Sequence, residues 1–121
     1  MTTGEIAKET NLSESTLRYY EKNGLIKVSR DVNGRRDYDE HDIEWIKFIQ
    51  HLKDTGMPLK DIQHYSDLRY LGENTMPERL KILQAHRKYM LDQQLKWEEY
   101  LQNLDSKINF YKKSINTSKT N

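Results

Sequence analysis

The chain has 121 residues, with 20 Lys and Arg against 19 Asp and Glu, no Cys, and only 35% hydrophobic residues. At this length we expect one compact domain with one appended element, and not a large two-domain enzyme. No run approaches the roughly 20 apolar residues of a membrane span, and the opening residues lack the apolar stretch of a signal peptide, so we expect no membrane contact and a cytoplasmic location. The lack of Cys excludes disulfides, thiolate metal sites and thiol-based redox sensing.

The net charge of +1 conceals three unlike segments. Residues 1–38 carry 7 basic and 6 acidic side chains, residues 39–75 carry 4 and 8, and residues 76–121 carry 9 and 5. The charges cancel only when the segments are summed, so a near-neutral total does not exclude nucleic-acid binding.

Residues 4–23 predict two short helices joined by a tight connection. Thr2 and Glu5 have the spacing of a capping box, which starts a helix that ends near Asn11. Ser13 is a good N-cap for a second helix, and Asn23-Gly24 stops that helix because Gly tolerates the left-handed position after a helix end. The arrangement is typical of a helix-turn-helix, although helical hairpins in ordinary bundles share it.

Residues 28–38 predict a small β-hairpin. Asn33-Gly34 separates two short arms, which favours a type I′ turn with positive φ at both central residues. A hairpin directly after a helix-turn-helix is a wing.

Two further helices complete the first domain. One begins at Asp39-Glu40, whose acids complement the helix dipole, and stops at Gly56; Pro58 opens the other, and residues 72–75 break it. We therefore predict a mainly α fold, with a winged helix-turn-helix DNA-binding domain over residues 1–71.

Residues 76–116 predict one long coiled-coil helix. Steps of four and three residues from Met76 reach apolar side chains at ten of twelve positions, which is a sustained heptad pattern. Nothing else in the chain could bury this seam, so we predict a homodimer. The predicted interface residues are Leu80, Leu83, Met90, Trp97, Leu101, Leu104, Ile108 and Tyr111. We expect residues 117–121 to be a disordered tail.

The second helix and the hairpin carry the side chains that suit DNA. Base edges and phosphates need hydroxyl, guanidinium and ammonium donors on a helix that enters the major groove. The predicted DNA-binding residues are Ser15, Thr16, Arg18, Tyr19, Tyr20, Lys22, Arg35, Arg36, Tyr38 and Lys53. Of the adjacent tyrosines, we expect Tyr19 to face DNA and Tyr20 to be more packed. Lys53 has two interpretations, a phosphate contact or an offset of the helix dipole.

Other site types find little support. The four histidines lack the i,i+4 spacing of a metal pair and no Cys assists them, so we predict no metal and no cofactor. Aromatic residues such as Trp97 could line a ligand pocket, but heptad packing already explains that position. No nucleophile–base pair, Gly-rich phosphate loop or carboxylate pair stands out, so we predict that the protein is not an enzyme.

Three motifs in combination resemble the MerR family of bacterial transcription regulators. They are TLRYYE followed by GLI, the R-x-Y end of the hairpin, and L-x-x-x-G-M-x-L-x-x-I, and the resemblance covers residues 2–71. It implies a dimer joined by an antiparallel coiled coil, with two heads in successive major grooves of a palindromic promoter spacer. It also implies DNA distortion that aligns promoter elements for RNA polymerase. By position, Thr16, Arg18 and Tyr19 fall on the recognition helix, and Arg35, Arg36 and Tyr38 on the wing.

Within the family the chain is most similar to the branch linked to aldehyde and electrophile stress. Members of that branch commonly have a Cys just before the L-[KR]-x-x-G-M segment, where this chain has His51, so a reactive-thiol trigger is not available. A small-molecule effector, the operator, the regulated genes and the direction of regulation stay open. The alternatives are an effector-independent repressor or architectural DNA-binding protein and, from a different class, a coiled-coil scaffold for other proteins.

Overall fold

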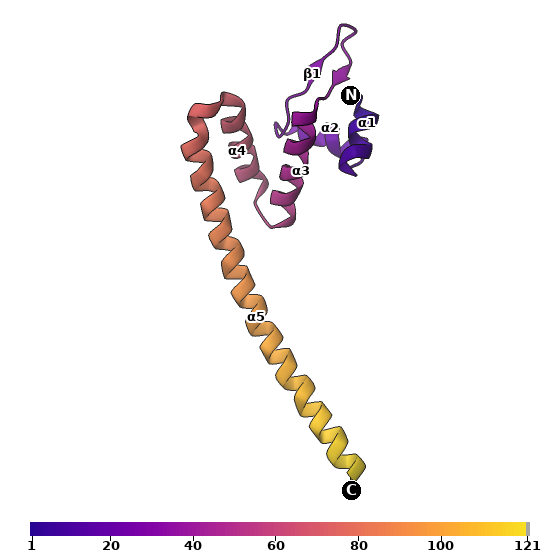
Figure 1. Cartoon of the computed structure of the whole chain (residues 1–121), viewed down its shortest axis with the longest axis vertical. Helices are drawn as coiled ribbons and strands as arrows, with labels where there is room; N and C mark the ends of the chain where they lie inside the picture. Colours follow the sequence, from indigo (N-terminus) through magenta and orange to yellow (C-terminus); the bar gives the residue numbers. More distant parts are fainter. Residues whose placement is uncertain (121) are drawn as a thin grey trace. The chain divides into compact units, whose positions relative to one another are not determined.

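The computed structural model describes residues 1–120, with residues 119 and 120 described by their backbone alone (Figure 1). The chain divides into two units, Met1–Leu83 and the part that begins at Gln84. We call the first unit the head. Asn121, the last residue of the predicted tail, lies outside the described residues.

The first two helices of the head are α1 (Thr3–Thr10) and α2 (Glu14–Lys22), and their ends follow the predicted signals. Thr2 caps α1 through a complete capping box with Glu5, and Asn11 ends the helix in the left-handed conformation. Ser13 caps α2 by accepting a hydrogen bond from the Thr16 N–H. Gly24, with φ of 73°, follows the last turn of α2, as expected of a glycine in that position. The helix-turn-helix is confirmed.

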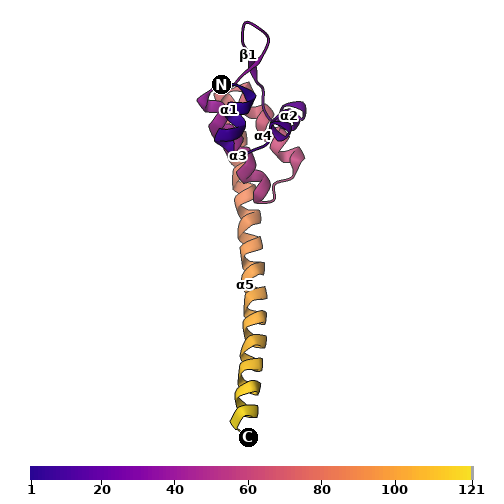
Figure 2. The same cartoon turned by 90° about the vertical axis from the view of Figure 1, so that its right-hand side faces the viewer.

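The hairpin pairs β1 (Ser29–Arg30) with β2 (Arg36–Asp37) in antiparallel register, and it projects from the head (Figure 2). The predicted type I′ turn is wrong, because Gly34 has a φ of 78° but Asn33 does not have positive φ. The Gly34 N–H instead donates to the Asp31 carbonyl, and the Asp31 side chain accepts from the N–H groups of Asn33 and Arg35. This Asx turn favours a type I turn followed by one left-handed glycine.

The other helices of the head are α3 (Glu40–Asp54), α4 (Leu59–Leu71) and a short 3-10 turn, η1 (Glu73–Thr75). Asp39 caps α3 through a capping box with Asp42, and Pro58 precedes the first turn of α4, where its missing N–H costs nothing. The Thr75 hydroxyl donates to the carbonyls of Leu68 and Gly72, which ties η1 to the end of α4.

The core of the head draws on α1, α2, α3 and α4. Its fully buried side chains include Ile6, Leu17, Leu25, Ile46, Ile49 and Ile62. Trp45 on α3 stacks on Tyr65 on α4 with 5.6 Å between ring centroids. The head thus completes its own core, and α2 is held by a stripe of buried residues on one side only.

The last helix, α5, spans Met76–Thr120. It therefore extends past residue 116, where we placed the end of the coiled coil, and through residues of the predicted disordered tail. Residues 117–120 contain neither Gly nor Pro, so nothing in them ends a helix. Up to Leu83 the helix belongs to the head, where Ile82 and Leu83 pack against the core.

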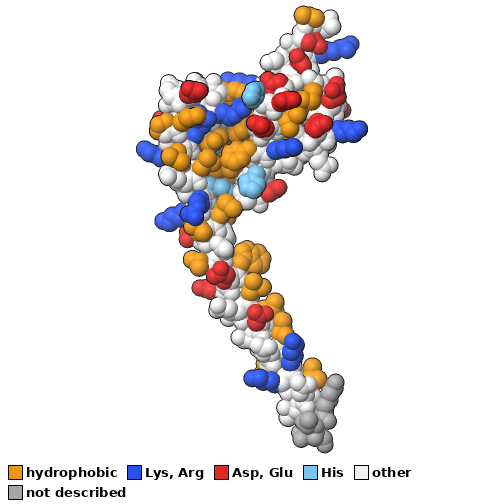
Figure 3. All heavy atoms as spheres, viewed as in Figure 1, with side chains coloured by type: hydrophobic (Ala, Val, Ile, Leu, Met, Phe, Trp, Pro, Cys, Tyr) orange, Lys and Arg blue, Asp and Glu red, His pale blue; other side chains and the backbone are white. Residues whose placement is uncertain are grey.

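Beyond Leu83 the helix carries a long set of exposed apolar side chains, drawn in orange on α5 in Figure 3. Trp97 is 65% exposed, and the other predicted seam residues from Met90 to Tyr111 are exposed as well. Within residues 1–120, no helix is both long and apolar enough to cross a membrane.

Candidate DNA interface

The exposed face of α2 carries four polar side chains. Ser15, Arg18, Tyr19 and Lys22 follow the i, i+3, i+4, i+7 spacing of one helix face, and all four are exposed. The opposite face is buried and holds α2 on the core through Leu17 and Tyr20. Tyr19 is 46% exposed and Tyr20 is 1% exposed, so the expectation that Tyr20 is the more packed of the two is confirmed, and the contact of Tyr19 with DNA stays a prediction. This face offers hydroxyl, guanidinium, phenol and ammonium donors together.

Two of the predicted DNA-binding residues are core residues instead. Tyr20 is 1% exposed and Tyr38 is 2% exposed, so neither ring is accessible to a duplex. Burial raises the pKa of both phenols, which keeps them neutral. Their assignment as DNA contacts was therefore wrong. Tyr20 lies three residues after the buried Leu17, on the face of α2 that packs on the core, so its ring points away from the exposed face.

Thr16 lies at the edge of the exposed face and is half-buried. Its hydroxyl is 2.8 Å from the Ser13 hydroxyl, within the cap of α2. Thr16 therefore supports the helix end more directly than the outward face.

Arg36 binds a carboxylate of its own head. Its Nε donates to Glu21 Oε2 at 2.7 Å, and Arg30 donates to the other oxygen, Glu21 Oε1, at 3.0 Å. The hydrogen bond that Arg36 donates to the Glu21 carboxylate raises the pKa of the Arg36 guanidinium. One residue of α2 thus holds both strands of the hairpin. Arg36 thus joins the wing to the helix, and a contact of its guanidinium with DNA stays a prediction.

Outside α2, two of the predicted DNA-binding residues are exposed. Arg35 lies in the hairpin turn, and Lys53, near the end of α3, places its Nζ 5.1 Å from the centroid of the Tyr20 ring. Lys53 is therefore next to α2, a position that suits a phosphate contact as well as the dipole of α3.

Sequence reasoning missed Glu21 and Arg30. Only the fold brings the Glu21 carboxylate against the two arginines at positions 30 and 36. The positions of Arg30 and Arg36 on either side of the turn were the available signal. Residues paired across a hairpin lie on the same face, so the two guanidinium groups could be expected to share one acidic partner.

Among the described residues, no group of three or more His, Asp or Glu side chains could hold a metal ion. The site is instead an outward helix face beside an ion-paired hairpin. These features define the class: a winged helix-turn-helix DNA-binding protein.

Known proteins with similar sequences narrow the class. Residues 1–68 match the family described as MerR HTH family regulatory protein, and residues 43–108 match the family described as MerR, DNA binding. An uncharacterized HTH-type transcriptional regulator of Haemophilus influenzae is 37% identical over 93% of this chain and 84% of its own length. The regulator AdhR of Bacillus subtilis is 39% identical over 76% of this chain and 66% of its own.

Solved structures give the same result. The crystal structure of HiNmlR, described as a MerR family regulator lacking the sensor domain, bound to promoter DNA, is 37% identical to this chain. It superposes with a TM-score of 0.81 over 93% of this chain and 90% of that one. A putative MerR family regulator from Listeria monocytogenes has a TM-score of 0.86 at 29% identity, over 92% of this chain and 85% of that one.

The chain belongs to the MerR family of transcriptional regulators. It is a DNA-binding regulator of transcription and not an enzyme. Family membership also decides against the scaffold interpretation.

Proposed function

We propose that the protein binds a palindromic promoter spacer as a homodimer and controls transcription by distorting the DNA between its two heads. The observation that carries the proposal is the polar face of α2, formed by Ser15, Arg18, Tyr19 and Lys22, on a helix that Glu21 joins to the wing. One such face covers few base pairs, so useful affinity needs two heads at a fixed separation.

The dimer follows from the apolar side chains of α5. Exposed Leu, Ile, Trp and Tyr residues from Leu80 to Tyr111 repeat with heptad spacing, and a second copy running antiparallel would bury them. Leu83 is a partial exception, because the head's own core already covers part of it.

The residues divide into two kinds of contact. Arg18 and Tyr19 lie at the centre of the outward face and would reach base edges, with Ser15 and Lys22 beside them. Arg35 and Lys53 would contact phosphates and so would add affinity without sequence preference.

The free energy needed to bend promoter DNA is small enough for a regulator to control. Bending 20–30 base pairs costs of the order of 1–6 kcal/mol, so a modest change in the dimer could switch the promoter between two geometries for RNA polymerase. We place the protein in the bacterial cytoplasm, where promoter DNA and polymerase are found. Without Cys, any effector must act through chemistry other than a thiol.

The test is substitution of Arg18 by Ala. A fluorescence anisotropy titration of the full chain on a duplex selected from a random library should show at least tenfold weaker binding, because a good side chain–base pair contributes about 1–3 kcal/mol. The matched control is Lys113→Ala, which removes one exposed positive charge from α5. Equal affinity of the Arg18 variant and the wild type would contradict the assignment.

In vitro transcription distinguishes the remaining alternative. A regulator that distorts its promoter changes the rate of open-complex formation with polymerase already bound. An effector-independent repressor would only compete with polymerase for the site.

A further inference from the structure

One face of α4 follows the backbone that joins the recognition helix to the wing. The joining segment is residues 23–28, between the end of α2 and β1. Gln63, Ser66 and Tyr70 have the i, i+3, i+7 spacing of one helix face, and each hydrogen-bonds to a backbone group of that segment. Their partners occur in the same order along the chain. We call these three residues the α4 row.

The contacts of the α4 row are short. Gln63 Nε2 donates to the Asn23 carbonyl at 3.0 Å. The Ser66 hydroxyl lies 2.7 Å from the Leu25 carbonyl and 3.2 Å from the Gly24 carbonyl. The Tyr70 hydroxyl accepts a hydrogen bond from the Lys27 N–H at 3.0 Å. The row therefore fixes backbone positions whatever side chains the segment carries.

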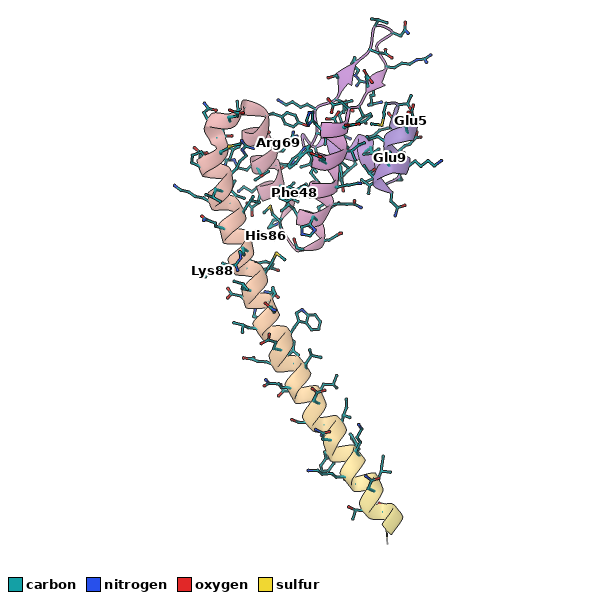
Figure 4. All side chains as sticks on the ribbon, viewed as in Figure 1. Glu5, Glu9, Phe48, Arg69, His86 and Lys88 are labelled. Carbon is teal, nitrogen blue, oxygen red and sulfur yellow. The ribbon has the colours of Figure 1, made fainter. Side chains whose placement is uncertain are left out.

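Neighbouring groups hold the middle and the Tyr70 end of the row in place. In the middle, Ser66 is fully buried, and Trp45 Nε1 on α3 donates to the same Leu25 carbonyl at 2.8 Å. At the Tyr70 end, the Arg69 guanidinium lies 4.7 Å from the Trp45 ring and 5.2 Å from the Tyr70 ring, and Lys27 Nζ lies 5.3 Å from the Tyr70 ring. Figure 4 labels Arg69 on α4 and Phe48 on α3, the helix against which α4 packs.

We propose that Gln63, Ser66 and Tyr70 are positioning residues that set the recognition helix and the wing relative to each other for sequence-specific DNA binding. The proposal rests on the proposed function, in which α2 meets base edges and the hairpin meets phosphates. Glu21 joins the same two elements on the α2 side, through Arg30 and Arg36. The α4 row acts on the backbone between them.

The two kinds of DNA contact respond differently to a small displacement. Hydrogen bonds to base edges weaken steeply when distance and angle are wrong. Contacts from long Lys and Arg side chains to phosphates are electrostatic and adjust to such a shift. Loss of the α4 row should therefore reduce discrimination between sequences and leave non-specific affinity unchanged.

The experiment compares two duplexes of about 30 base pairs, one selected by the wild-type full chain from a random library and one scrambled, by anisotropy across a salt series. The main variant is the double substitution Gln63→Ala with Tyr70→Phe, which removes two of the three contacts of the row. The single variant Tyr70→Phe removes only the hydroxyl that accepts from the Lys27 N–H. Thr10→Val is the matched control, because it removes a buried hydroxyl that donates to the Ile6 carbonyl at 2.7 Å, far along the chain from the row.

We expect the ratio of selected to scrambled affinity to fall about tenfold in the double variant, as for the loss of one good base contact. The scrambled-duplex affinity and the salt slope should stay at wild-type values, and Thr10→Val should keep the wild-type ratio. Thermal unfolding by circular dichroism, run on all variants, shows whether each one folds.

The outcomes separate the two proposals. A wild-type chain that prefers no selected duplex over the scrambled one overturns the proposed function. A wild-type preference that the double variant retains overturns the role of the α4 row. A ratio that falls equally in Thr10→Val also overturns it, since the effect then follows lost stability and not position.

Discussion

The head and the part of α5 beyond Leu83 bury apolar side chains in opposite ways. Within the head, side chains from α1, α2, α3 and α4 close one core in which Ile6, Leu17 and Ile46 are fully buried. Along α5 from Gln84 onward, apolar residues recur just as regularly but stay exposed in the single chain. A helix in water gains most of its stability from packing an apolar face, so the second region needs a partner that the first does not.

The largest expected effect comes from the exposed region. Leu101→Lys places a charge in the middle of the heptad seam, and we expect the dimer to dissociate into monomers, with high-affinity DNA binding lost along with it. Light scattering measures the mass, and circular dichroism verifies that the head still folds. Gln102→Lys adds the same charge one position outside the seam and should leave the dimer intact. A dimer that persists in Leu101→Lys refutes the seam.

A substitution in the core of the head should lower stability without affecting the dimer. Leu17→Ala opens a cavity under α2 and should lower the free energy of unfolding by about 2–5 kcal/mol. Because the head closes its own core, this loss should be the same at low and high protein concentration. Leu104→Ala on α5 should instead give a loss that depends on concentration, as expected when stability is linked to association. Urea unfolding at two concentrations measures both, and a concentration-dependent loss in Leu17→Ala would contradict a self-sufficient head.

The smallest expected effect lies at the edge of the head, where Glu21 holds the wing. Glu21→Gln keeps one acceptor oxygen but loses the charge shared by Arg30 and Arg36, so we expect a loss of about 1 kcal/mol, limited by partial exposure of the three side chains. Glu9→Gln, on the exposed side of α1, removes the same charge and is the control. Thermal unfolding compares the two, and an equal effect would mean that the ion pairs contribute nothing to the wing.

Local signals were sufficient to predict most of the fold. Ser13, Asn23-Gly24 and Asp39 act through residues three or four positions away, so a pattern in the sequence contains the whole interaction. The turn at Asn33 is equally local, but the Asn33-Gly34 pair alone predicted the wrong turn type, because the Asp31 side chain competes by accepting from the N–H groups of Asn33 and Arg35. The end of α5 was misjudged because polar composition alone does not stop a helix.

The candidate site was less predictable, because its details depend on distant residues. Spacing on α2 was enough to place Arg18 and Tyr19 outward, but the burial of Tyr38 and the pairing of Arg36 depend on contacts that only the fold brings together. The α4 row could not be predicted from the sequence for the same reason, since Gln63 and its partner Asn23 are 40 positions apart. Residues that position a DNA-binding element therefore need the structure to be found.

The central claim is that two copies of one head, joined through α5, bind a single duplex. Sedimentation velocity of the full chain with one selected duplex measures this directly, because it reports the mass of the complex. The account predicts two copies of the 14.6 kDa chain on each duplex at every protein concentration that gives binding. A stable complex of one chain with one duplex, formed with undiminished affinity, would contradict it.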